Sequence, residues 1–197
     1  MAQYGKQDAI KMQTFIQFVE NQEDEKKLAV YDFDGTLFKS PEQDEGIHIF
    51  KQKTGQEWPF KGWWGRKESL MPPLVPLKPE MDWYYNNVVE NQRKDTADPN
   101  TTVVLMTGRH IGLKNRVMEI IDNANMVFDD TYFTGQSGTS GSNTFEIKAN
   151  NIKKLLLQGF STIEIWEDRE EHVREFANLC KELIANGIIN KIGRAHV

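Results

Sequence analysis

The residues of this chain best suited to chemistry are two aspartates, Asp32 and Asp34, separated by one residue and followed by Gly35. They come directly after the apolar residues 28–30, which predict a strand buried on both faces. Side chains alternate along a strand, so both carboxylates can face one site. Two acids held this close repel each other unless a cation lies between them or one is protonated. The pair predicts a metal-dependent site in which one acid attacks and the other moves protons, although Asp and Gly also serve as simple turn residues.

A second polar group, Thr107, Gly108 and Arg109, follows the β-branched stretch 101–106, which predicts another strand. Ligands of open α/β sheets bind at the carboxyl ends of the strands, so we expect this group near the aspartates. The Thr107 hydroxyl can donate to a phosphate oxygen, and Gly108 lets the backbone amide approach the same oxygen. Arg109 offers a planar fork for a second phosphate group or for the substrate backbone. Taken alone, Thr107 could equally be a turn residue.

The set is completed by Lys148 at the start of a predicted helix and by Glu167 and Asp168 after the predicted strand 161–166. A lysine supplies a point charge to a phosphate and to a nucleophile, although two later lysines of the same helix compete for this role. The acidic pair provides the hard oxygen ligands that suit Mg²⁺. Acids at a helix start also stabilise the helix dipole, so each motif alone has an ordinary structural explanation.

In chain order these motifs resemble those of the haloacid-dehalogenase-like (HAD) phosphohydrolases, whose first motif reads Asp-x-Asp-Gly-Thr. The resemblance implies that Asp32 is the nucleophile, which forms an aspartyl phosphate, and that Asp34 is the general acid and base. It implies that Thr107 and Lys148 stabilise the phosphate oxygens. It also implies Mg²⁺ as cofactor, held by Asp32, the carbonyl of Asp34 and Asp168.

Further stretches are similar to the Swiss-army-knife RNA-repair-like group and to the phosphatase half of phage polynucleotide kinase, over residues 28–189. They are Gly62-Trp63-Trp64, Thr107-Gly108-Arg109, Thr144-Phe145-x-x-Lys148 and Glu167-Asp168-Arg169-x-x-His172. One departure is Glu167, which stands where the family more often has Asp. Its longer side chain predicts that Asp168 binds the metal directly and that Glu167 acts behind it. His172 either orients an acid or lies on a helix surface.

Alternating strands and helices predict a parallel sheet with right-handed crossovers, in a three-layer α/β sandwich with a small irregular cap. Helices are predicted for residues 9–21, 80–94, 114–123, 148–157 and 170–186. Strands are predicted for residues 28–30, 101–106 and 161–166, with an interrupted strand in 126–133 and the start of a last strand at 188–189. A Gly/Ser-rich loop is predicted for residues 136–143.

The cap is predicted from residues 39–79, whose six prolines break helices and exclude central strands, with a short helix at 47–52. Its cations are Lys61, Arg66 and Lys67. They could hold a phosphate chain while Trp63 and Trp64 stack nucleic-acid bases. The alternative is that at least two of the three tryptophans, Trp58, Trp63 and Trp64, form the cap's own core, because aromatic side chains bury much apolar area.

The composition is that of an ordinary soluble domain, with 197 residues, 39% hydrophobic and 27% charged. The net charge of −5 gives no general attraction to nucleic acid or to anionic membranes. The single cysteine, Cys180, permits no intrachain disulfide and favours a reducing compartment. With no run of about 18 apolar residues and no apolar leader, we expect a cytoplasmic protein without a membrane partner.

We divide the chain into an N-terminal helix (1–27), a catalytic domain (28–190) with the cap insertion (39–79), and a final segment (191–197). One reading frame of a common sequencing adapter encodes residues 192–197, and Lys191 fits the preceding codon. We interpret 191–197 as an artefact that replaces the true C-terminus, and we exclude it from the fold prediction.

The sequence predicts a phosphatase that removes terminal phosphates from nucleic acid, at 3′ ends. One alternative is a phosphatase of free nucleotides or other small metabolites, in which the insertion closes as a lid. The other is a binding module that keeps the fold without catalysis, and the full set of motif residues argues against it. The oligomeric state does not follow from the sequence.

Overall fold

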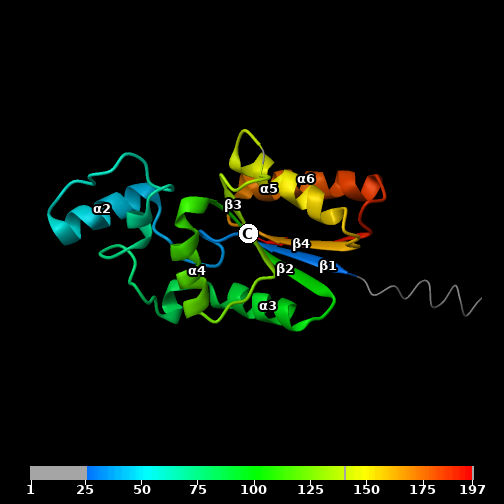
Figure 1. The fold of residues 1–197 in the computed structure, drawn as a ribbon, viewed down its shortest axis with the longest axis horizontal. Coiled ribbons are helices and arrows are strands. Elements are labelled where there is room, and N and C mark those ends of the chain that lie inside the picture. Colours follow the sequence, from blue (N-terminus) through cyan, green and yellow to red (C-terminus); the bar gives the residue numbers. More distant parts are fainter. Residues whose placement is uncertain (1–25, 140, 197) are drawn as a thin grey trace, which may run out of the picture.

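The computed structural model describes residues 26–139 and 141–196, with side chains described as far as Ile192. Within them a five-stranded parallel sheet has the order β3-β2-β1-β4-β5. The strands are β1 (Lys27–Tyr31), β2 (Thr101–His110), β3 (Asp130–Thr134), β4 (Thr162–Trp166) and β5 (Lys191–His196). Helices cover both faces, which confirms the predicted three-layer sandwich (Figure 1). The helix predicted for residues 9–21 lies outside the described residues.

Helices lie on each face of the sheet, and a further one lies out in the insertion (Figure 1). The α-helices are α2 (Gln43–Thr54), α3 (Asn86–Ala97), α4 (Lys114–Asn123), α5 (Thr144–Leu156) and α6 (Glu170–Ala185). The apolar sides of α3 and α4 share one buried cluster with the sheet, and those of α5 and α6 share the other. None of the described helices is long and apolar enough to cross a membrane.

Strand β1 lies at the centre of the sheet and sets its register. Tyr31, its last residue, lies opposite Leu105 of β2 and Trp166 of β4. Side chains alternate between the faces, so Tyr31 packs in the cluster with α3 and α4, and Leu28 and Val30 pack in the cluster with α5 and α6. The chain that leaves β1 therefore emerges between β2 and β4.

The insertion has a core of its own that is continuous with the cluster beneath α3 and α4. Trp63 is buried there, and its indole N–H donates to the carbonyl of Pro41 at 3.1 Å. Gly46 of α2 leaves the room for this ring, because a Cβ at that position would overlap it. Arg116 of α4 anchors the far side of the insertion by donating to three of its carbonyls, those of Leu70 at 2.9 Å, Pro76 at 2.7 Å and Leu77 at 3.0 Å.

The helix predicted for residues 80–94 begins later than expected. A short 3₁₀ turn (Met81–Trp83) comes first, and α3 begins only at Asn86. Tyr84 instead forms an antiparallel bridge with Phe38, and its hydroxyl donates to the carbonyl of Ile120 at 2.8 Å. Tertiary contacts to the chain after β1 thus override the helical pattern of this stretch.

Several other boundaries differ from the predicted ones. Strand β2 continues through the Thr107–Arg109 motif to His110, and β3 starts at Asp130, so Met126–Phe128 is not a strand. Helix α5 begins at Thr144 rather than at residue 148 because Asn143 caps it, its side chain accepting from the N–H of Glu146 at 2.9 Å.

The last strand begins at Lys191 rather than at Ile188. Gly187 ends α6 with a φ of +67°, and the N–H of Ile188 donates back to the carbonyl of Leu183 at 2.9 Å, which keeps Ile188 on the helix end. Strand β5 is therefore formed by the segment excluded from the fold prediction, paired with β4. This pairing says nothing about the origin of the segment, so the adapter interpretation stays a prediction.

Candidate active site

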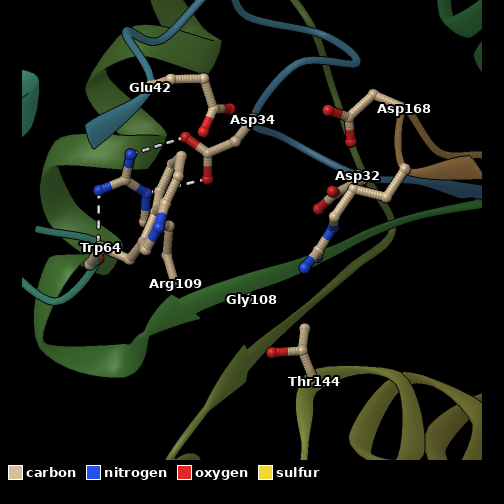
Figure 2. A pocket seen from close by; sticks show the side chains of 9 residues that line it. Asp32, Asp34, Glu42, Trp64, Gly108, Arg109, Thr144 and Asp168 are labelled. Atoms are coloured by element: carbon tan, nitrogen blue, oxygen red, sulfur yellow. Dashed lines mark hydrogen bonds and ion pairs between the residues drawn. The ribbon is translucent and has the colours of Figure 1, made fainter. Parts of the chain in front are cut away.

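Three acids meet at the carboxyl ends of β1 and β4. Asp32 directly follows β1, and its backbone N–H donates to the carbonyl of Trp166 at 3.0 Å, which ties it to the end of β4. Glu167 and Asp168 directly follow β4. Carboxylate oxygens of the three acids all lie within 4.8 Å of one another. The carboxylates of Asp32 and Asp168 lie side by side in Figure 2.

Lys148 joins this cluster from the second turn of α5. Its ammonium is buried and lies 3.0 Å from Oδ1 of Asp32 and 2.6 Å from Oε2 of Glu167. Burial acts to lower the pKa of Lys148, but the charges of Asp32 and Glu167 outweigh it and raise the pKa. The lysine is therefore cationic and links the acid after β1 to an acid after β4.

The acids of the cluster differ in how strongly each holds a proton. Burial raises the pKa of Asp32, and the charges of Glu167 and Asp34 add to the rise while Lys148 opposes it. Burial and the charge of Glu167 raise the pKa of Asp168 to about 6. Burial also acts to raise the pKa of Glu167, but His172 and Lys148 outweigh it and lower the pKa. Asp32 and Asp168 are thus the acids of the cluster whose ionised forms are disfavoured, mainly by burial and further by neighbouring negative charge.

The donor set of this cluster suits a hard divalent cation. Oδ1 of Asp32 is buried and accepts no hydrogen bond from the residues that the structure describes, in spite of its ion pair with Lys148. Glu167 is engaged by Lys148, and Nδ1 of His172 lies 3.4 Å from its Oε2. A Cβ at Gly35 would overlap the Asp168 carboxylate, so glycine leaves this acid its place beside the aspartate motif. Carboxylate oxygens are the ligands that Mg²⁺ prefers, and Asp32 and Asp168 are the best placed to supply them.

Asp34 faces the same pocket, but its carboxylate turns toward Arg109 of β2. Arg109 donates from Nε to Oδ2 at 2.9 Å and from Nη2 to Oδ1 at 2.7 Å, a two-pronged ion pair (Figure 2). Ser40 also donates to Oδ1, at 2.6 Å. The carboxylate of Asp34 is thus engaged by Arg109 and Ser40 and does not belong to the cluster of Asp32, Glu167 and Asp168.

These groups line a pocket of about 370 Å³. Its lining residues are Asp32, Asp34, Glu42, Trp64, Gly108, Arg109, Thr144, Asp168 and Arg169. The side chain of Arg169 is 47% exposed, and its nearest ion-pair contact among the described residues, to Oε1 of Glu167, is as long as 3.4 Å. Arg169 is therefore a cation of the pocket that a substrate can reach.

Two residues predicted to touch the substrate lie elsewhere or serve other contacts. Trp63 is only 1% exposed and packs at 4.9 Å from the Trp58 ring, so the prediction that it stacks a base is wrong. Its neighbour Trp64 is 38% exposed and lines the pocket. Thr107 is buried behind the pocket wall, where its hydroxyl accepts from the N–H of Arg109 at 3.1 Å, whereas Gly108 does line the pocket.

Sequence reasoning assigned no role to three residues that line the pocket, Glu42, Thr144 and Arg169. Thr144 is the first residue of α5, directly after the N-cap Asn143. Asn is a common N-cap residue, so the sequence itself indicated that a helix could begin at Thr144, near the strand ends. Arg169 follows the acidic pair directly and could have been found from that position. Glu42 comes from the insertion, whose path has no periodic signal.

Residues 43–194 match the family described as HAD domain family 1 in Swiss Army Knife RNA repair proteins. The matched stretch contains Lys148 and Asp168 but begins after Asp32 and Asp34. The inclusion of these two aspartates in the site therefore rests on their position and contacts in the structure. Among curated proteins none matches the chain.

Two of the solved structures that match the chain have low sequence identity and TM-scores below 0.5. A chain of the Pnkp1/Rnl/Hen1 complex is 12% identical with a TM-score of 0.43, over 89% of this chain and 48% of that one. The HAD domain of effector protein Lem4 from Legionella pneumophila is 14% identical with a TM-score of 0.42, over 87% and 85%. The present chain thus spans about half the length of the chain in the Pnkp1/Rnl/Hen1 complex.

Proposed function

The chain belongs to the HAD domain family of the Swiss Army Knife RNA repair proteins, and from this membership we propose that it is a phosphatase that hydrolyses phosphate monoesters. The observation that carries the proposal is the burial of Asp32 at the end of β1, beside Lys148 and two further acids. A carboxylate in this setting is a nucleophile for phosphorus. The neighbouring cations stabilise the charge of a phosphoryl group in transfer.

The proposed reaction has two steps. An oxygen of Asp32 bonds to phosphorus as the bond to the leaving oxygen breaks, and Asp34 gives that oxygen a proton. Asp34 then takes a proton from water, which attacks the aspartyl phosphate and releases inorganic phosphate and Asp32. Lys148 and the backbone at Gly108 stabilise the phosphate oxygens, with Thr107 orienting that backbone.

Asp32, Asp168 and the carbonyl of Asp34 would hold Mg²⁺ in this site. The ion supplies positive charge that offsets the repulsion between a carboxylate nucleophile and a phosphate. Glu167 keeps its contacts to Lys148 and His172 and so orients the lysine rather than the ion. This division is supported by the burial of Glu167 and the greater exposure of Asp168.

For the substrate we propose the 3′-phosphorylated end of a nucleic acid. Trp64 presents an exposed indole at the pocket, on which a base can stack, and Arg169 can pair with a phosphate of the chain. One observation favours the alternative of free nucleotides or small metabolites. Glu42 also lines the pocket, and its charge, like the net charge of −5, repels a longer polyanion.

The comparison that separates the two substrates is kcat/KM for a 3′-phosphorylated oligonucleotide against the matching 3′-mononucleotide. A nucleic-acid phosphatase favours the oligonucleotide, by about tenfold for one added stacking contact. The preference should shrink as salt is added, because phosphate contacts release counterions. A ratio at or below one supports the small-metabolite alternative.

A further inference from the structure

The Arg109 guanidinium has contacts at each of its three nitrogens within the described part of the chain. Nε and Nη2 donate to the two oxygens of Asp34. Nη1 donates to Oγ of Ser69 at 2.8 Å and to the carbonyl of Trp64 at 3.1 Å. The side chain has no exposed surface. Arg109 therefore does not offer the free fork for a substrate phosphate that the sequence predicted.

These contacts connect the insertion to the carboxylate of Asp34. Ser69 is fully buried, and its hydroxyl donates to the carbonyl of Arg66 at 2.7 Å, so its oxygen is fixed in place for Arg109. The Trp64 ring lies over the guanidinium, 4.9 Å from its central carbon. The Trp64 ring and the Ser69 hydroxyl together fix the orientation of the guanidinium. In this orientation the edge that carries Nε and Nη2 faces Asp34.

We propose that Arg109 is a positioning residue that holds the carboxylate of Asp34 in place for proton transfer. Because Arg109 is itself fixed by Trp64 and Ser69, the position of this carboxylate then depends on the insertion. This inference rests on the proposed phosphatase function, in which Asp34 protonates the leaving oxygen. A carboxylate can otherwise rotate about its side-chain bonds, and general acid catalysis needs it within hydrogen-bond reach of one atom. The two-pronged pair removes that freedom.

The sequence predicted that Arg109 binds a substrate phosphate, but Arg169 is the arginine placed to do so. It lines the pocket, its side chain is half exposed, and within the described part of the chain its ion-pair contact is the long one to Glu167. The two arginines thus divide two tasks, Arg169 facing the substrate and Arg109 facing the acid. Loss of Arg169 should raise KM for all substrates, whereas loss of Arg109 should lower kcat/KM most for substrates with a poor leaving group.

The test compares two substrates in the Arg109→Lys protein. An alkyl phosphate has a poor leaving group and needs a general acid, whereas a nitrophenyl phosphate leaves as a stable anion and needs little help. We compare kcat/KM, because it reports the steps up to phosphoryl transfer to Asp32 and leaves out the later hydrolysis that both substrates share. General acid catalysis contributes about 10²–10⁴-fold, so kcat/KM for the alkyl phosphate should fall by about 100-fold or more. For the nitrophenyl phosphate kcat/KM should fall by about tenfold or less.

Arg116→Lys is the matched control. Arg116 is an equally buried arginine that donates to three carbonyls of the same insertion. Like Arg109→Lys, this substitution weakens contacts between the sheet domain and the insertion, but the hydrogen bonds of Arg116 to the insertion do not involve Asp34. The Arg116→Lys protein should lose thermal stability yet keep the wild-type ratio of the two substrates.

Ser69→Ala provides a milder variant should Arg109→Lys fail to fold, as judged by near-ultraviolet circular dichroism. It removes one acceptor of Arg109 and should change the substrate ratio in the same direction by about threefold to tenfold, the effect of one hydrogen bond. Equal losses on both substrates, a rise in KM alone, or the same ratio change in Arg116→Lys would overturn the inference. A wild-type protein that hydrolyses neither substrate would instead contradict the proposed function itself.

Discussion

The two aspartates of the site are held by two different parts of the molecule. Asp32 belongs to a cluster built by the sheet and α5, in which Lys148 joins it to Glu167. Asp34 is held by Arg109, whose other contacts come from the insertion. Asp32, the proposed nucleophile, thus depends on the sheet and α5, and Asp34, the proposed acid, depends on contacts to the insertion. In the proposed mechanism, phosphoryl transfer and proton transfer can therefore be perturbed separately.

Asp32→Asn gives the largest expected effect on the first cluster. An amide cannot attack phosphorus, so turnover of a nitrophenyl phosphate should fall by at least about 10³-fold, as for other lost nucleophiles. The melting temperature should not fall, since the change removes a carboxylate from a crowded acidic cluster. If the Asp32→Asn protein hydrolysed the nitrophenyl phosphate at a rate within about tenfold of wild type, Asp32 would not be the nucleophile.

Lys148→Met tests whether the cluster is a single unit. Removing one partner of a buried ion pair leaves the other charges unpaired, at a cost of about 3–5 kcal/mol. Chemical denaturation should therefore show a clear loss of the free energy of unfolding, together with the loss of activity. Lys153→Met, on the exposed side of the same helix, is the control and should change neither. A stable Lys148→Met protein would show that the acids are not held as charges.

The adjacent tryptophans of the insertion provide a second contrast. Trp64→Ala should raise KM for an oligonucleotide about tenfold, since stacking one base contributes about 1–3 kcal/mol. A small aryl phosphate should be affected little.

Trp63→Ala should instead cost about 3–5 kcal/mol of stability, because the ring is in the core. Both changes are measured on one set of purified variants, by steady-state kinetics and by denaturant titration. An equal rise of KM for both substrates in Trp64→Ala would exclude base stacking.

The smallest expected effect is on stability as a function of pH. The pKa of Asp32 and that of Asp168 are raised in the folded, metal-free site, the latter to about 6. The folded state then binds protons that the unfolded state releases, so these groups make stability fall as pH rises from about 4 through about 6. A cation in place of those protons removes the penalty. The melting temperature gained from Mg²⁺ over chelator should therefore be larger at about pH 8 than at about pH 5. An equal gain at both values would contradict the assignment of these acids as ligands.

The sheet and the position of its polar ends could be predicted because they obey local rules. The apolar residues of β1 and the β-branched residues of β2 predict strands, and parallel strands bring the residues after their carboxyl ends to one edge. Asp32, Glu167 and Asp168 come together for this reason alone. Lys148 needs only that a helix begin shortly before it.

The partners of Arg109 could not be predicted in the same way. Its contacts at Trp64 and Ser69 lie about 40 or more positions away, in a segment whose prolines erase any periodicity. For the same reason a one-residue difference decides that Trp63 enters the core and Trp64 the pocket. Tyr84 shows the effect within a periodic stretch, where a bridge to Phe38 overrides the helical pattern.

The central claim, that Asp32 carries the phosphoryl group, is tested most directly by rapid acid quench of a single turnover and mass spectrometry of the quenched protein. We expect one phosphate bound to the peptide that contains Asp32, rising and falling in the wild-type protein as the substrate is consumed. In Asp34→Asn the bound phosphate should persist, because the water that releases it lacks its base. Complete consumption of the substrate with no protein-bound phosphate at any time, or phosphate on another peptide, would contradict the account.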